Sequence, residues 1–481
     1  MQICKFNHIK MILEVLDVCN KFQQVIKDVL ESKYFLLLVS VLTIINYYFK
    51  LGICTYVETA IFLILMIVSN SQFLYLPSIV IFILGGGLTT APNYKSFSFV
   101  LLCISGVLLV GFVIYFVVKK RKELVCITLS NSLVLTTILL VVGMLLSMIT
   151  SIKPLTTLGA IGGFLVNLVV MYFVLTTVKN DDEKKEKLAQ SFVAIFYVIF
   201  IMILIEFFKL LSDHNIKELL FNKGIFKLSW AHSNHYCAIL SICSIFSLYL
   251  FISTFSKTNM LKKIFYIFPT IGTLLLSIFI VSRGPLFGLC AAISVAYILT
   301  IIEFRKNKKT FITLSTIAVV GICFIMLLYL FVIKDAFGDK GLNGRQEIWP
   351  VAWRYFKENW FLGTGYGTQR IFIIAETSQT VYNYHNYFLQ ISTCGIVGII
   401  AFIIYLVNIG WHCINKLNWF NITFIAIFAL FLTNGFVDTL FFSNKIMPLF
   451  SICLCYLDLK PKEVELAKYW DKLDCNNKVY I

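Results

Sequence analysis

Two arginines and one histidine are the residues of this sequence best suited to chemistry. Arg283 lies in VSRGPLFGL, where Gly284 and Pro285 separate two apolar stretches. Arg345 begins a Trp-containing amphipathic segment, and His385 is one of the last polar residues before another apolar stretch. Guanidinium groups bind phosphate and pyrophosphate, and a neutral imidazole can accept a proton from a hydroxyl group. These residue types therefore indicate an anion site with a nearby proton acceptor.

Three further residues are candidates for binding a substrate. Arg354 and Arg370 lie in the same polar segment as Arg345. Asn234 lies in WAHSNHYCAIL, between His232 and a second histidine, at the mouth of an apolar stretch where polar side chains often line a pocket. Each candidate is also compatible with a plain surface or interfacial position, so both interpretations stay open at this point.

The run GTGYG at 363–367 invites two interpretations that its context does not support. A dinucleotide-binding loop follows a strand and opens a helix, whereas this run lies in a long polar segment. A potassium filter has a similar sequence, but it is buried between pore helices. We expect a flexible glycine turn instead.

The composition indicates a membrane protein. Of 481 residues, 59% are hydrophobic and only 14% are charged, and the mean hydropathy is +0.86. Soluble globular proteins average about 25% charged residues. Apolar stretches of about 18–25 residues recur along the chain, which is the length of a transmembrane helix. Because lipid-exposed backbone must form its hydrogen bonds internally, we predict an all-α polytopic bundle of about 12–14 transmembrane helices.

A long polar segment, 334–385, divides this bundle unequally. Residues 1–33 carry apolar side chains at helical spacing, which predicts a cytoplasmic amphipathic segment on the membrane surface. The first part of the bundle covers 34–333, the last three helices lie in 386–457, and a tail follows at 458–481. The predicted helices fall roughly at 34–49, 51–68, 72–88, 97–118, 124–149, 157–178, 189–211, 232–254, 264–281, 285–303, 311–333, 386–409, 420–437 and 441–457.

The distribution of lysine and arginine predicts the orientation. Basic clusters occur at 119–122, 184–187, 257–263, 305–309 and 460–478, and the predicted helices place all of them on one side. Such clusters concentrate in cytoplasmic segments. We therefore expect a bacterial cytoplasmic membrane protein with both termini inside and the long polar segment outside. This bias accounts for the net charge of +16, so no nucleic-acid partner is expected.

The 14 cysteines contain no CxxC motif and no metal-ligand spacing. Most lie in apolar stretches, where a cysteine behaves as a small apolar residue. We expect neither disulfides nor a metal site from them.

Several short motifs occur in an order that resembles the O-antigen ligase and polysaccharide polymerase family. They are SNHYCAIL, SRGP, GRQEIWPVAW, FLGTGYG, HNYFLQ and CGIVGII. The resemblance covers residues 230–410, and the N-terminal half matches in topology alone. The proline that usually precedes the glycine-rich turn is replaced here, where the sequence is NWFLGTG. The geometry of that turn is therefore not carried over.

The resemblance implies a membrane glycosyltransferase that acts on the outer face. Family members transfer a sugar chain from a polyprenyl diphosphate to a hydroxyl group, without a nucleotide sugar, cofactor or essential metal. By this resemblance, Arg283 and Arg345 would hold the diphosphate, and His385 would position or deprotonate the acceptor hydroxyl. The expected partners are the polyprenyl-diphosphate-linked oligosaccharide, membrane lipid, and a flippase and chain-length regulator of the same pathway.

Three functions remain open on the sequence. We favour a polymerase of lipid-linked repeat units for capsule, exopolysaccharide or O-antigen. A ligase that moves a finished glycan to a lipid or protein shares the same donor chemistry. A flippase would need a polar path through the bundle. The apolar stretches hold few charges, mainly Glu58 and Glu206, whereas polar groups gather in the 334–385 segment, which favours an enzyme.

Overall fold

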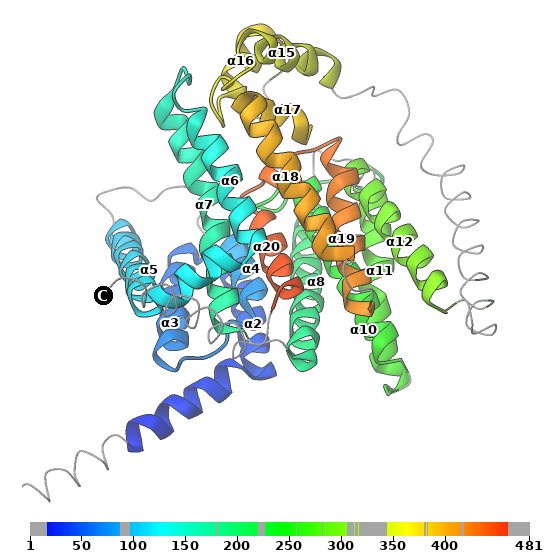
Figure 1. The fold of residues 1–481 in the computed structure, drawn as a ribbon. Coiled ribbons are helices and arrows are strands. Elements are labelled where there is room, and N and C mark those ends of the chain that lie inside the picture. Colours follow the sequence, from blue (N-terminus) through cyan, green and yellow to red (C-terminus); the bar gives the residue numbers. More distant parts are fainter. Residues whose placement is uncertain are drawn as a thin grey trace, which may run out of the picture.

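The computed structural model shows a helical bundle (Figure 1). It describes residues 17–86, 97–178, 181–219, 227–255, 257–280, 282–304, 312, 316, 344–379, 381, 383–414 and 418–459. Within these residues there is no strand, and the β-bridge between Leu228 and Ala231 is isolated. The prediction of an all-α polytopic membrane protein is therefore confirmed. The helix predicted at 311–333 and the tail at 460–481 lie outside the described residues, apart from Ile312 and Thr316.

Seven helical segments in the described part of the chain are long and apolar enough to cross a membrane. They are α5 (Phe97–Ser130), α7 (Pro154–Thr177), α8 (Asp182–Leu210), α10 (Ser233–Ser253), α11 (Met260–Phe279), α12 (Arg283–Phe304) and the continuous run of α17 (Tyr387–Ile391), η2 (Ser392–Cys394) and α18 (Gly395–Ile414). Shorter apolar helices are α2 (Lys33–Phe49), α3 (Gly52–Val68), α4 (Leu76–Gly86), α6 (Ser132–Leu146), α19 (Trp419–Gly435) and α20 (Met447–Leu457). The described residues thus contain seven candidate transmembrane segments, and the predicted number of about 12–14 stays a prediction.

One predicted boundary is wrong. The basic run at 119–122 was expected in a loop between two helices, but it lies inside α5. The helix continues to Ser130, and the side chain of Asn131 then caps α6 by accepting a hydrogen bond from the backbone N–H of Val134. Lysine and arginine are good helix formers, so a basic run does not by itself end a helix.

The middle of the bundle is formed by α8, α10 and α20, whose side chains are largely buried. Phe192 of α8 stacks on Phe246 of α10 with ring centroids 4.4 Å apart. Phe431 of α19 stacks on Phe450 of α20 at 4.0 Å. Offset stacking of this kind adds about 0.5–1.5 kcal/mol to the burial of the rings. These contacts hold the last two helices against the centre of the bundle.

Small residues let the helices near one end of the bundle approach closely. A Cβ atom on Gly288 of α12 would lie 3.1 Å from the carbonyl oxygen of Leu430 on α19. On the other side, a Cβ atom on Gly143 of α6 would lie 3.4 Å from Cα of Gly398 on α18. Close backbone contact through small residues is typical of membrane helix pairs. It fixes α12 against α19 and α6 against α18.

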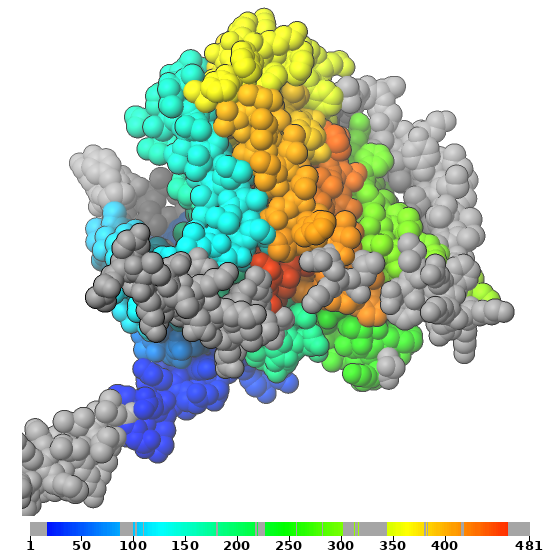
Figure 2. Space-filling model, viewed as in Figure 1, coloured from blue at the N-terminus to red at the C-terminus, as the bar shows by residue number. Residues whose placement is uncertain are grey.

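Two helices of the 334–385 segment cover this same end of the bundle, and we call them the cap. They are α15 (Arg345–Glu358) and α16 (Gln369–Glu376). In Figure 1 they lie at the top, above α6, α17 and α18, and Figure 2 shows them as a yellow layer over that end. Ile348 and Ala352 of α15 pack with Ile373 of α16 and Tyr384 in a small core of their own. The cap is therefore an ordered unit with its own apolar core.

The glycine-rich turn anchors the cap to the bundle, which contradicts the expectation of a flexible turn. The backbone N–H groups of Thr364 and Gly365 donate to the carbonyl oxygen of Thr393, at 2.9 and 3.0 Å. The hydroxyl group of Thr150 donates to the carbonyl oxygen of Gly363 at 2.8 Å. Gly363 has a φ of +78°, and a Cβ atom there would lie 2.1 Å from the oxygen of Thr393. The glycines are thus needed for close backbone docking.

Replacing Gly363 by alanine should loosen the cap. The new Cβ atom would meet backbone, and a non-glycine residue in this left-handed region costs about 1–3 kcal/mol. We expect faster hydrogen exchange across 344–379 and a lower thermal unfolding midpoint of the purified protein. Gly159→Ala is the matched control, because no atom of another residue lies within 4 Å of its Cβ position. Equal exchange in the two variants would contradict this account of the turn.

Candidate functional site

A buried aspartate, Asp438, is the centre of the candidate site beneath the cap. It lies between the end of α19 and η3 (Leu440–Phe442), and it is only 3% exposed. Its carboxylate accepts hydrogen bonds from the side-chain amide of Asn234 at 3.0 Å and from the backbone N–H of Thr439 at 2.8 Å. A buried carboxylate requires such partners, because an isolated charge away from water is very costly.

His385 lies on the other side of this carboxylate. Its Nδ1 atom is 3.5 Å from Oδ1 of Asp438, which is an ion-pair distance and longer than a strong hydrogen bond. Its side chain is 26% exposed, whereas that of Asp438 is 5% exposed. A proton on Nδ1 faces the carboxylate, so Nε2 is left to accept a proton from another molecule. This is the arrangement that a general base requires.

The backbone at His385 is held in an unusual conformation. Its φ is 51°, in the left-handed region that bulky residues rarely adopt, and its N–H donates to the side chain of Asn383 at 3.1 Å. The next residue, Asn386, caps α17 through Phe388 N–H at 2.9 Å and donates to the carbonyl oxygen of Phe436 at 3.2 Å. Strain of this kind persists where surrounding contacts enforce it, often at functional sites.

Gly435, at the end of α19, allows the segment that carries His385 to lie close to Asp438. A Cβ atom on Gly435 would lie 2.2 Å from the ring of Tyr387, so any larger residue would push α17 away. Tyr387 is buried and also packs against Phe436 and Phe441. The approach of Tyr387 to Gly435 brings His385 within reach of Asp438.

The electrostatics of Asp438 follow from its neighbours. Burial alone would raise the pKa of its carboxyl group, but the hydrogen bond and charge of His385, the charge of His235 and the Thr439 N–H outweigh burial. The pKa of Asp438 is therefore lowered below its ordinary value. The group is therefore a carboxylate at neutral pH.

Arg345 approaches the same cluster from the cap. It is the first residue of α15, after Gly344 with a φ of 76°, and its Nη2 atom donates to the carbonyl oxygen of Val437 at 2.5 Å. Burial lowers the pKa of Arg345, the charge of Asp438 raises it and the charge of Arg283 lowers it again. Arginine stays charged at neutral pH in spite of such shifts. Arg283 and Arg345 therefore repel one another electrostatically.

Arg283 reaches the site from the start of α12. The preceding residue, Ser282, donates its hydroxyl hydrogen to the side-chain oxygen of Asn234 at 3.0 Å. Asn234 in turn donates to Asp438. The N-terminal end of a 22-residue helix carries a partial positive charge, which adds to that of Arg283. The charge of Arg283 also acts on Arg345, and positive charge next to a helix N-terminus favours an anionic ligand.

The other two predicted arginines lie on the cap itself. Arg354 of α15 is 53% exposed in its side chain and pairs with Glu376 of α16, which also accepts a hydrogen bond from Tyr355. Arg370 is exposed on α16. The ion pair of Arg354 links the two cap helices. A role of Arg354 and Arg370 in binding substrate stays a prediction.

Sequence reasoning missed Asp438, the residue around which the site is arranged. Between Glu376 and Asp458 it is the only acidic residue of the chain, and it stands between two apolar helices. That isolation was the available signal, because acids near membrane helices are rare and usually functional. His235, predicted to line a pocket with Asn234, interacts electrostatically with Asp438 and His385.

The two acids inside apolar stretches have partners after all. Glu58 of α3 accepts a hydrogen bond from the side chain of Asn46 at 2.7 Å. Glu206 of α8 accepts one from the hydroxyl group of Tyr47 at 2.8 Å and pairs with Lys209 at 3.1 Å. These contacts tie α2 to α3 and α8.

The fold and the site together define a polytopic α-helical membrane protein with arginines and a His–Asp pair beneath a helical cap. The family model described as O-antigen ligase matches residues 269–406. This match supports the O-antigen ligase, or Wzy-type, family that the motifs resemble, and it indicates a glycosyltransferase-like enzyme in a broad sense. It covers Arg283, Arg345 and His385, but Asn234 and Asp438 lie outside it. No curated protein shows significant similarity to the chain.

Replacing Asp438 by asparagine should destabilise the protein in a pH-dependent way. The lowered pKa means that the carboxylate contributes stability above its ordinary pKa of about 3.9 and loses it as the pH falls below that value. We expect a loss of about 1–3 kcal/mol near neutral pH, which shrinks toward pH 3. Thermal unfolding of the purified protein between pH 3 and 7 measures it.

Asp213→Asn, which removes an exposed carboxylate, serves as the control and should change little at any pH. A loss for Asp438→Asn that is the same at pH 3 and pH 7 would show that the charge of Asp438 is not what stabilises the fold.

Proposed function

We propose that the protein polymerises oligosaccharide repeat units carried on a polyprenyl diphosphate, on the outer face of the cytoplasmic membrane. The observation that carries the proposal is the approach of Arg345 and His385 from the 334–385 segment, and of Asn234 from the bundle, to Asp438. Arg283 lies near enough to Arg345 to act on its charge. The O-antigen ligase match over residues 269–406 supports the reaction class.

In this proposal the two arginines bind the diphosphate of the donor. Arg283 and Arg345 repel one another in the absence of an anion, and a diphosphate between them relieves that repulsion. During transfer the bond between the anomeric carbon and the phosphate oxygen breaks, and negative charge develops on the leaving diphosphate. Groups placed in advance against such charge are usually the largest contribution to catalysis.

His385 is the proposed base for the acceptor. The acceptor hydroxyl oxygen forms the new bond to the anomeric carbon, and its proton passes to Nε2 of His385. Asp438 faces Nδ1 and stabilises the imidazolium that results. Asn234 and Ser282 hold Asp438 in place and are positioning residues. Base catalysis of this kind contributes about 10²–10⁴-fold.

The ligase alternative shares this donor chemistry, and the two activities differ only in the acceptor. The polymerase stays our preference. A flippase is less well supported, because the acids inside the bundle, Glu58 and Glu206, are held by Asn46, Tyr47 and Lys209. A deletion strain distinguishes these classes. Lipid-linked units gather on the outer face if the enzyme proposal holds, and on the inner face if the protein is a flippase.

Alanine substitution of His385, Arg283 or Arg345 should abolish long polymer while the protein level in the membrane stays normal. We expect turnover of a polyprenyl-diphosphate oligosaccharide by the purified protein to fall about 10²–10⁴-fold for His385→Ala. Loss of either arginine should also raise the KM for the donor, because it removes charge from the diphosphate site. Product length is read from the glycan ladder on a gel.

Lys357→Ala removes an exposed charge from the same cap helix and is the matched control, expected to keep full turnover. A ladder of products supports the polymerase, and a single transferred glycan supports the ligase. Full-length polymer from all three variants would overturn the assignment of the site.

A further inference from the structure

Asn434, on the last turn of α19, is a fully buried polar residue that no step of the proposed transfer uses. It is 0% exposed, and neither its Oδ1 nor its Nδ2 atom forms a hydrogen bond with any residue that the structure describes. Nearly all buried polar side chains are hydrogen-bonded, and one that is not lowers the stability of the fold. A leucine of similar size would avoid that loss. The amide of Asn434 is therefore a feature that stability alone does not explain.

Asn434 lies one helical turn before Asp438. Its carbonyl oxygen accepts hydrogen bonds from the N–H groups of Val437 and Asp438, at 3.0 and 2.9 Å. Residues four apart lie on the same face of a helix. The carbonyl oxygen of Val437, in this same turn, accepts the hydrogen bond of Arg345 from the cap. The turn that begins at Asn434 is therefore part of the candidate site.

The side chain of Asn434 extends along α12 toward the N-terminal end of that helix. The helices α12 and α19 lie side by side (Figure 1). The Cβ atom of Asn434 lies 3.3 Å from the position that a Cβ atom on Gly288 would take, and its Oδ1 atom lies 2.7 Å from the corresponding position on Gly284. Gly284 is one turn closer to the start of α12 and directly follows Arg283. The amide is therefore placed at the start of α12.

The start of α12 is suited to an anion, and Gly284 leaves room there for the amide. The first N–H groups of a helix have no acceptor within the helix and carry its partial positive charge. Helix α12 has 22 residues, and Arg283 is the first of them. A Cβ atom on Gly284 would lie 2.7 Å from Oδ1 of Asn434 and 3.1 Å from Cγ2 of Val437, so a side chain there would displace one of them. The glycine thus lets the amide approach a helix terminus that favours anions.

We propose that Nδ2 of Asn434 donates a hydrogen bond to a phosphate oxygen of the donor diphosphate at the start of α12. The inference rests on the proposed function and adds a substrate-binding residue to it. Arg283 and Arg345 supply charge, and the amide supplies a directed, neutral donor. A group that is unpaired in the free protein and paired with substrate strengthens binding at the expense of stability. Substitution of Asn434 should therefore change these two properties in opposite directions.

Arg345 links the binding of the diphosphate to the exposure of the amide. Val437 and Asn434 both lie against Gly284, and Val437 is half-buried. Arg345 donates to the carbonyl oxygen of Val437, so the cap holds this turn in place. A diphosphate that binds Arg345 competes with that hydrogen bond. The turn is then free to open and to present the amide to the same ligand.

The test compares Asn434→Leu with the wild-type full chain, each purified in nanodiscs. Farnesyl diphosphate is the probe, because it carries a prenyl diphosphate without a sugar and requires no transfer. We expect its Kd to rise about 10- to 100-fold, which is the effect of one hydrogen bond to a charged group. The thermal unfolding midpoint without the probe should equal or exceed that of the wild type. Asn434→Ala, which adds no bulk beside Gly288, should weaken binding to the same extent.

Asn167→Leu is the matched control. Asn167 of α7 is 1% exposed, and its amide likewise has no hydrogen-bond partner within the described part of the chain, but it does not belong to the site. Its substitution should leave the Kd of farnesyl diphosphate unchanged. Equal weakening in the two leucine variants would show a general effect of replacing buried amides and would overturn the proposal.

Other results would overturn it in distinguishable ways. Unchanged binding in both Asn434 variants would end the role of the amide, and the proposed function would still stand if Arg283→Ala and Arg345→Ala weaken binding. A lowered unfolding midpoint for Asn434→Leu would show that the amide is paired within the fold. Inorganic pyrophosphate that binds as tightly as farnesyl diphosphate would assign the site to a free anion. A wild-type protein that does not bind farnesyl diphosphate would contradict the proposed function and this inference together.

Discussion

The site depends on one buried carboxylate and the partners that it needs. Asp438 is almost fully removed from solvent, and it accepts one hydrogen bond from the next residue, Thr439, and one from Asn234, which is 204 residues away. Asn234 brings the start of α10 to it, and His385 brings the segment before α17. Because an unpaired charge there would be very costly, the carboxylate specifies the arrangement of these elements as well as their chemistry.

The cap adds a second constraint, because it carries one of the two arginines of the site. Arg345 keeps its contact with Val437 only if α15 is held down, and the docking of Gly363 against Thr393 and Thr150 does this. The small apolar core around Ile348 and Tyr384 packs α15 against the segment that carries His385. The glycines have no reactive side chain, but their close packing sets the position of Arg345.

The sequence predicted the helical class well, because charged residues are rare in so apolar a chain. The roles of Arg283, Arg345 and His385 stay predictions. The sequence did not predict their convergence, since the packing of α12 on α19 and of Tyr387 on Gly435 joins residues far apart in the sequence. Asp438 belongs to no local sequence pattern. The docking of the GTGYG turn depends on Thr393, which lies beyond α16 in the chain. Local patterns predict elements, and long-range packing decides which side chains meet.

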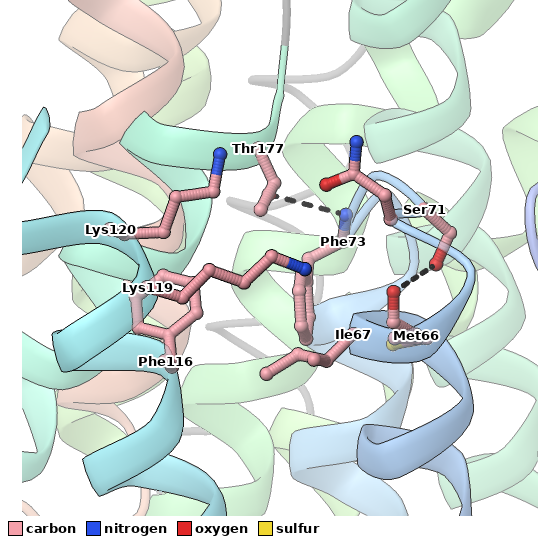
Figure 3. A pocket seen from close by; sticks show the side chains of 9 residues that line it. Met66, Ile67, Ser71, Phe73, Phe116, Lys119, Lys120 and Thr177 are labelled. Carbon is pink, nitrogen blue, oxygen red and sulfur yellow. Dashed lines mark hydrogen bonds between the residues drawn. The ribbon is translucent and has the colours of Figure 1, made fainter.

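The two ends of the bundle differ in where their charged side chains lie. At the cap end, Arg345 and His385 lie close to the buried carboxylate of Asp438. At the other end, Lys119 and Lys120 of α5 lie near Phe73 and Phe116 (Figure 3), and the helix at 17–30 exposes apolar side chains. A charge held inside a folded site acts on a bound substrate, whereas a charge at the headgroup level acts on lipid. Positive side chains therefore lie in a buried cluster at one end and at the surface at the other.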